Sequence, residues 1–242
     1  MLPGPAHQSH KRILQGPSQG RDRILDATGE DAIARRLTRP LRSSRLSASV
    51  RALCVIGSGL RLMALKRAGL FETIQASAGR LDILVNSSGV AEHASLEETT
   101  EEHIDRAFGL NVRAMVFTVQ HAVRFMGKGG AVVLIGSIAG GMANPGYGSY
   151  SASKAAVRAY ARTWNADLAT RGIRVNTLSP GPTDTPMFDQ ASDEIRQALS
   201  ARIPAKRLGN PDEVAAAAFF LASSESAHVR GAELVIDGGM SA

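Results

Sequence analysis

The chain of 242 residues is poor in several residue types, and each scarcity excludes a class of protein. A single cysteine, Cys54, excludes an internal disulfide framework and is typical of a reducing compartment, so we expect a cytoplasmic protein. The six histidines are scattered without the spacing of a metal site, so we expect no bound metal. No apolar run is as long as a membrane-spanning helix, and we expect no membrane association. The remaining composition, 44% hydrophobic and 21% charged, is ordinary for one globular α/β domain.

Acidic residues are scarce in the first third of the chain and plentiful in the rest. Residues 1–80 contain 14 Lys and Arg against 5 Asp and Glu, a net charge of +9, whereas residues 81–242 contain 14 against 17, a net charge of −3. A basic start is typical of an organelle transit peptide or of a nucleic-acid-binding arm. Four acidic residues between positions 22 and 31 weaken the first interpretation. Residues 1–50 contain no aromatic side chain, which weakens the second, so we expect no nucleic-acid partner.

From about residue 60 onward, apolar patterns alternate between strand and helix. Nearly continuous apolar runs predict buried parallel strands at 82–86, 131–137 and 173–179, and a last strand and turn at 232–239. Amphipathic segments predict helices at 60–78, 99–126 and 149–171, and a further helix after Pro211. Thr99 and Glu102 form a capping-box pattern at the start of the second helix. Such alternation predicts a parallel sheet whose turns meet at the carboxyl edge, where open α/β sheets bind their ligands.

The pair Tyr150 and Lys154 has the strongest chemical character in the sequence. Gly146 and Gly148 precede it and an alanine-rich segment follows, so a helix should begin near Ser149 with both side chains in its first turn. A lysine is electrostatically unfavourable there, because a helix N-terminus already carries partial positive charge. A neighbouring ammonium and a helix N-terminus would both lower the pKa of a tyrosine, so the pair is predicted to be a general acid/base. The alternative is a surface tyrosine beside a solvated lysine.

The stretch Tyr150-Ser151-Ala152-Ser153-Lys154, with Ser137 thirteen residues upstream, resembles the short-chain dehydrogenase/reductase family. The resemblance covers about residues 68–242. It implies a single-domain, Rossmann-type doubly wound parallel sheet, and reversible hydride transfer between NAD(P)(H) and a small-molecule alcohol or ketone. NAD and NADP stay open as alternatives. The resemblance also implies a homotetramer.

The resemblance further implies a role for each residue of the catalytic set. Tyr150 would give its proton to the carbonyl oxygen, and Ser137 would bond and orient that oxygen. Lys154 would lower the pKa of Tyr150 and hold the nicotinamide ribose. Asn111 would sit at a local helix break and hold a water in the proton relay. For Asn111, the alternative is an ordinary buried amide bonded to backbone.

Two further stretches match the family's cofactor-binding motifs. Asn86-Ser87-Ser88-Gly89 resembles its Asn-Asn-Ala-Gly motif, and residues 180–185 match its Pro-Gly-x-x-x-Thr motif. The cofactor-binding set that the resemblance implies is Asn86, Gly89, Tyr150, Lys154, Pro180, Gly181, Thr183 and Thr185.

Residues 1–67 depart from the family. The family begins with a strand and a Thr-Gly-x-x-x-Gly-x-Gly turn that receives the dinucleotide phosphates, of which Thr28-Gly29 is only a remnant. Residues 54–59 predict a strand and turn rather than a phosphate cradle, and no buried strand is expected in residues 1–50. We therefore expect residues 1–67 to be an atypical basic segment, as a shifted reading frame would produce, and dinucleotide binding to be weak or absent. The rival function is a non-catalytic scaffold of the same fold.

Overall fold

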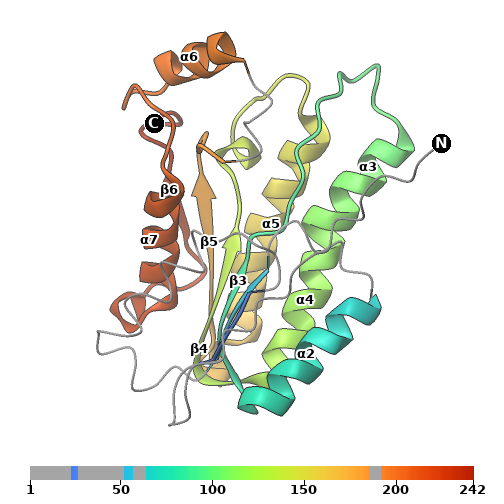
Figure 1. Cartoon of the computed structure of the whole chain (residues 1–242), viewed down its shortest axis with the longest axis vertical. Helices are drawn as coiled ribbons and strands as arrows, with labels where there is room; N and C mark the ends of the chain where they lie inside the picture. The colour runs from blue at the N-terminus through green and yellow to red at the C-terminus, as the bar shows by residue number, and fades with distance from the viewer. Residues whose placement is uncertain (1–22, 27–51, 57–63, 186–191) are drawn as a thin grey trace, which may run out of the picture.

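The structure, a computed structural model, describes residues 23–26, 52–56, 64–185 and 192–242. Its centre is a parallel sheet whose six described strands follow one another in chain order across the sheet (Figure 1). The strands are β1 (Arg23–Asp26), β2 (Ala52–Ile56), β3 (Leu81–Asn86), β4 (Met126–Ile135), β5 (Arg174–Pro180) and β6 (Glu233–Ile236). Helices alternate with these strands, so the predicted Rossmann-type α/β fold is confirmed.

Helices cover both faces of the sheet because its central strands are apolar on both sides. Three helices lie on one face, α2 (Ala64–Ala78), α4 (Met115–Ala122) and α5 (Gly148–Asp167). One helix, α7 (Pro211–Ala222), lies on the other face. Strand β4 supplies both cores in alternation: Val132 and Leu134 pack toward α4 and α5, and Val133 packs toward α7. The two cores fix where α5 and the strand ends lie relative to each other.

The helix predicted at 99–126 is divided into shorter pieces. It begins as α3 (Glu101–Phe108), passes through a π-helical turn over Gly109–Ala114, continues as α4 and ends in a 3-10 turn over Val123–Phe125. The predicted cap is wrong by one position, because Thr100 rather than Thr99 accepts the hydrogen bond from the backbone of His103. Thr99 instead donates its hydroxyl to the carbonyl of Ser95 at 2.7 Å.

Two strands differ from the sequence predictions. Strand β4 begins at Met126 rather than at 131, because Met126 pairs with Leu81 before the register shifts. Glycines at 127, 129 and 130 hide this start, since they leave no apolar alternation to detect. The sequence pattern gave no sign of the short strand at Arg23–Asp26, because four residues are too few to show periodicity. The strand predicted at 54–56 is confirmed as part of β2.

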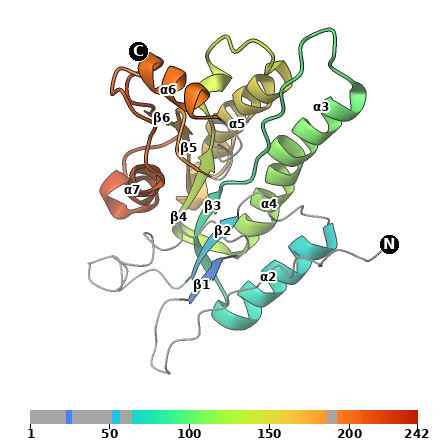
Figure 2. The same cartoon turned by 45° about the horizontal axis from the view of Figure 1, so that its top comes forward.

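The remaining helix, α6 (Asp193–Arg202), lies beyond the carboxyl edge of the sheet, and none of its residues is buried (Figure 2). The turn after β2 and most of residues 1–63 lie outside the described residues. The boundary near residue 67 and the missing phosphate-binding unit therefore stay predictions. No helix in the described part of the chain is long and apolar enough to cross a membrane.

Candidate active site

The carboxyl ends of three neighbouring strands meet at one edge of the sheet. Asn86 is paired beside Leu134, and Ile135 is paired beside Leu178, so β3, β4 and β5 end level with one another. The first turn of α5 begins at the same edge, because α5 returns along the sheet from the carboxyl to the amino end (Figure 2). The sequence pattern predicted this convergence, and the edge carries most of the predicted site residues.

Ser137 and Tyr150 meet at this edge. Ser137 is buried, and its hydroxyl accepts a hydrogen bond from the backbone N–H of Ala139 at 3.1 Å, which caps the 3-10 turn over Ile138–Gly140. The Ser137 side chain lies close enough to the Tyr150 hydroxyl to lower the pKa of that tyrosine. The two hydroxyls that the sequence places thirteen residues apart therefore lie side by side at this edge.

The pKa of Tyr150 differs in direction from the sequence prediction. Burial raises the pKa of Tyr150 above its ordinary value, and the nearby Ser137 side chain, which lowers that pKa, only partly opposes this. The prediction of a lowered pKa is therefore wrong for Tyr150 in the protein without ligands. The spacing of Tyr150 and Lys154 identifies the nearby charge, but it does not reveal that the tyrosine hydroxyl is removed from water.

Lys154 lies inside the protein rather than in solvent. Its side chain belongs to a residue only 4% exposed, and its ammonium Nζ donates to the carbonyl of Ile135 at 2.9 Å. The same Nζ lies 5.8 Å from the centre of the Tyr150 ring. A Cβ at Gly89 would lie 3.2 Å from this Nζ, so the glycine leaves room for the ammonium. The alternative of a solvated lysine is wrong.

Asn111 braces the first turn of α5 from a neighbouring helix. It lies in the π-helical turn, which confirms the predicted helix break. Its amide oxygen accepts from the N–H of Val90 at 2.8 Å, and its amide nitrogen donates to the carbonyl of Val90 and to the hydroxyl of Ser153, both at 2.9 Å. Ser153 in turn donates to the carbonyl of Tyr150 at 2.7 Å. The side chain of Asn111 therefore bonds backbone, as in the alternative interpretation, and its relay role stays a prediction.

The predicted cofactor residues on the first strand of the site leave one buried acceptor without a partner. Asn86 is 3% exposed and donates its amide nitrogen to the hydroxyl of Ser88 at 3.1 Å. Its amide oxygen is buried and has no hydrogen-bond partner among the described residues. A buried acceptor of this kind costs free energy unless a ligand or water satisfies it.

The predicted cofactor residues after β5 form a tight turn. A Cβ at Gly181 would lie 2.7 Å from the Cβ of Asp237, so close packing against the turn after β6 explains this glycine. Thr183 donates its hydroxyl to the carbonyl of Gly181 at 3.0 Å, which engages it within the turn. Pro180 and Thr185 are half-buried at the same edge.

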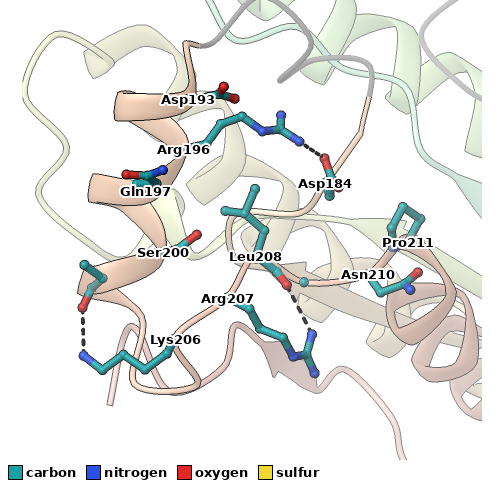
Figure 3. A pocket seen from close by; sticks show the side chains of 12 residues that line it. Asp184, Asp193, Arg196, Gln197, Ser200, Lys206, Arg207, Leu208, Asn210 and Pro211 are labelled. Carbon is teal, nitrogen blue, oxygen red and sulfur yellow. Dashed lines mark hydrogen bonds and ion pairs between the residues drawn. The ribbon is translucent and has the colours of Figure 1, made fainter.

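A cavity of about 740 Å³ lies between α6 and the start of α7 (Figure 3). Two of its arginines are engaged in ion pairs: Arg196 pairs with Asp184, and Arg207 pairs with Glu213 at 2.7 Å. Its lining includes neither Tyr150 nor Lys154. In the described residues, no three side chains of His, Cys, Asp or Glu gather as metal ligands would.

Comparison with known proteins relates the chain to a family of reductases and dehydrogenases. Residues 66–241 match the family model described as enoyl-(acyl carrier protein) reductase. A 3-oxoacyl-(acyl-carrier-protein) reductase FabG of Thermotoga maritima is 39% identical over 171 residues, 70% of each chain. A cyclopentanol dehydrogenase of a Comamonas species is 39% identical over 178 residues, 72% of this chain and 71% of that protein. A short-chain dehydrogenase of Burkholderia cenocepacia, crystallised with NADP, is 29% identical with a TM-score of 0.74, covering 91% of this chain and 98% of that chain.

Proposed function

The chain belongs to the short-chain dehydrogenase/reductase family, and from this premise we propose that it transfers a hydride between NAD(P)(H) and a small alcohol or ketone. The observation that carries the proposal is the buried ammonium of Lys154, 5.8 Å from the Tyr150 ring, with the Ser137 side chain close enough to act on the pKa of Tyr150. A proton donor, an orienting hydroxyl and a fixed cation are the groups that reduction of a carbonyl needs.

The residues at the carboxyl edge fit the nicotinamide half of a dinucleotide. The unpartnered amide oxygen of Asn86 offers an acceptor, and the absence of a side chain at Gly89 leaves room for the ammonium of Lys154. We infer that Asn86, Gly89, Lys154, Pro180, Gly181 and Thr185 hold the cofactor, with Thr183 shaping the turn. The bound dinucleotide would supply or accept the hydride. The NADP found in the Burkholderia cenocepacia structure supports this class of cofactor.

In the reducing direction, Tyr150 donates its hydroxyl proton to the substrate's carbonyl oxygen while Ser137 donates a hydrogen bond to the same oxygen. The raised pKa of Tyr150 keeps the hydroxyl protonated at neutral pH, which suits a general acid. Reduction should therefore slow as the pH rises through the pKa of Tyr150. Alcohol oxidation needs the deprotonated form, so it should speed up over the same range.

Lys154 and the helical turn that contains Asn111 have supporting roles in the proton transfer by Tyr150. Lys154 places a positive charge near the tyrosine ring, which favours the tyrosinate that proton transfer leaves. The amide of Asn111 is already bonded to Val90 and Ser153, so it has little capacity to bind a relay water. Such a water would instead bind backbone groups in the π-helical turn, where the regular α-helical hydrogen bonds are interrupted.

We also propose that the chain assembles as a homotetramer. Val235 on the terminal strand β6 is 45% exposed, and Phe220 on α7 is 38% exposed, so apolar surface is available on that side. Light scattering at micromolar concentration measures the assembly state directly. A stable monomer would contradict this part of the proposal.

The experiment that tests the function is a pair of titrations on the full chain and on Tyr150→Phe. Binding of NADH and NADPH is followed by nicotinamide fluorescence, and turnover is followed at 340 nm with a panel of small ketones. We expect Tyr150→Phe to bind cofactor to the same extent as the parent, and to lose turnover by about 10³-fold because one hydroxyl carries the proton. Turnover of Tyr150→Phe within tenfold of the parent would refute the role of Tyr150. Absence of binding in both proteins would favour the non-catalytic scaffold.

A further inference from the structure

The turn that carries Ser137 packs directly against the backbone of α5. This turn, residues 136–141, contains glycine at 136, 140 and 141. A Cβ at Gly140 would lie 2.9 Å from the backbone nitrogen of Ala155 and from the carbonyl carbon of Lys154. Backbone atoms inside a helix cannot move aside, so the backbone of the turn is in close contact with the backbone of α5 and leaves no room for a side chain at Gly140. Its position relative to Tyr150 then depends on what holds it there.

Three polar side chains from three elements form a connected network beside this turn. Arg158, one helical turn after Lys154, pairs its Nε with a carboxylate oxygen of Glu233 at 2.8 Å. The hydroxyl of Ser179 donates to the other carboxylate oxygen at 2.6 Å. Ser179 is completely buried, and the side chains of Arg158 and Glu233 are 26% and 21% exposed. Both oxygens of Glu233 are thus engaged, which joins α5 to β5 and β6.

The network touches the Ser137 turn at both of its ends. A Cβ at Gly136 would lie 2.6 Å from the hydroxyl oxygen of Ser179. A Cβ at Gly141 would lie 2.7 Å from a terminal guanidinium nitrogen of Arg158. Ser179 therefore lies against the start of the turn and Arg158 against its end, with Glu233 holding the two together.

We propose that Arg158, Glu233 and Ser179 are positioning residues that hold the Ser137 turn against the first turn of α5. The proposal rests on the proposed function, since Ser137 must meet the same carbonyl oxygen as Tyr150. Misplacing a reacting group by about 1 Å costs on the order of 10²-fold in rate, so a brace at both ends of a short turn has a catalytic consequence.

Exposed ion pairs elsewhere in the chain lack this arrangement. In the pair of Arg106 with Glu92 the side chains are 52% and 40% exposed, and in that of Arg207 with Glu213 they are 57% and 42% exposed. Pairs this exposed contribute little to stability, because water screens both charges. The network of Glu233 is less exposed, bonds a buried hydroxyl and adjoins a catalytic turn, so its loss should alter function more than global stability.

The test compares Glu233→Gln and Ser179→Ala with a matched control, Arg171→Met. Arg171 donates to the carbonyl of Met126 at 2.9 Å at the opposite end of the sheet, so its loss also removes an arginine contact but leaves the Ser137 turn alone. We expect Glu233→Gln to lower kcat by about tenfold or more while KM changes less than about threefold. Arg158→Lys, which keeps the charge, should lower kcat less than Glu233→Gln does. The control should retain the kcat of the parent.

Two readouts need neither substrate nor cofactor. Backbone amide exchange in residues 138–141 should become at least about tenfold faster in Glu233→Gln and stay unchanged in the control. The pKa of Tyr150 should rise further above its ordinary value, because the Ser137 side chain, which lowers that pKa, would lie less close to the Tyr150 hydroxyl. The chain has only three tyrosines, so absorbance titration against Tyr150→Phe isolates this group.

The outcomes separate this proposal from the proposed function. If the parent turns over no ketone, the proposed function fails, and amide exchange still decides whether the network holds the turn. Unchanged exchange and an unchanged Tyr150 titration in both Glu233→Gln and Ser179→Ala would overturn the positioning role. If Glu233→Gln does not fold, Ser179→Ala alone decides, because it removes one hydroxyl and no charge.

Discussion

The two ends of α5 differ in how well their local interactions stabilise the helix. The first turn has no side-chain cap at Tyr147 and no acidic residue, and it buries the ammonium of Lys154 near the positive end of the helix dipole. The last turns of α5 bury no charged side chain. Tyr160 and Trp164 pack ring to ring at 4.7 Å, and the chain leaves through Gly172 with a left-handed φ of 68°.

This contrast separates what the helix contributes to catalysis from what it contributes to folding. Val157 and Ala161 join the core between α5 and the sheet, and Trp164 packs against its edge. That packing anchors the helix, and the anchored helix can then hold an unfavourable cation and an uncapped start at its other end. Local violations of stability rules that persist in a fold are expected at functional sites. Substitutions at the two ends should therefore change different measured quantities.

The largest effect is expected from Lys154→Met. We expect kcat/KM to fall by about 10²-fold or more, with weaker NADPH binding, because a fixed positive charge beside Tyr150 is lost. The melting temperature should stay level or rise, because replacing a buried ionic group by an apolar one of similar length is often neutral or stabilising. Scanning calorimetry and steady-state kinetics measure the two. A large fall in the melting temperature of Lys154→Met would mean that Lys154 stabilises the fold. The first turn of α5 would then not differ from the last turns in its contribution to stability.

The next effect is expected from Gly140→Ala, which forces the Ser137 turn away from α5. Its Cβ would meet helix backbone at 2.9 Å, and overpacking of this kind costs about 1–3 kcal/mol. We expect kcat to fall by about tenfold or more. Gly127→Ala, near the start of strand β4 and away from the turn, is the control, because the added Cβ would meet open space. Equal kinetics in the two variants would show that the turn tolerates displacement.

The sequence predicts the parts of the site that depend on neighbouring residues in the chain. Gly146 and Gly148 followed by alanines place the helix start, and the spacing of Tyr150 and Lys154 places both in one turn. Strand ends are predictable because continuous apolar runs stop where the site begins, as at Asn86. These signals identify the carboxyl edge of the sheet and the side chains gathered there.

The rest depends on burial and on contacts between distant segments, which leave no local signal. The pKa of Tyr150 is raised by desolvation that only the packed structure imposes. Arg158, Ser179 and Glu233 come from three elements far apart in the chain, and each alone reads as an ordinary polar residue. Strand β1 is equally invisible, because it depends on pairing with β2 rather than on its own pattern.

Beyond the first turn of α5, in the part of the helix that packs on the sheet, Val157→Ala should lower the stability of the protein with little effect on catalysis. Val157 is 1% exposed in the core between α5 and the sheet, and removing its two methyl groups should cost about 1–2.5 kcal/mol of unfolding free energy. Urea denaturation measures that loss. We expect kcat to stay within about threefold of the parent, since the change is smaller than a displaced catalytic group would cause. A tenfold loss of kcat in folded protein would show that core packing and the first turn are coupled.

The smallest effect is expected from Gly148→Ala at the start of α5. No atom lies within 4 Å of a Cβ at this position, and alanine favours a helix over glycine by up to about 1 kcal/mol. For a chain of this size, that corresponds to a rise in melting temperature of about 2–4 °C at most.

Gly146→Ala is the matched comparison for Gly148→Ala, two residues away, and the opposite sign is expected. Gly146 has a left-handed φ of 77°, and a Cβ there would collide with the ring of His93, so this variant should melt at a lower temperature than the parent. If Gly148→Ala raises the melting temperature and leaves kcat unchanged, the uncapped start is a tolerated weakness rather than a requirement. If kcat falls as the melting temperature rises, the loosely held first turn takes part in turnover, because the added methyl group contacts nothing and acts only through helix stability.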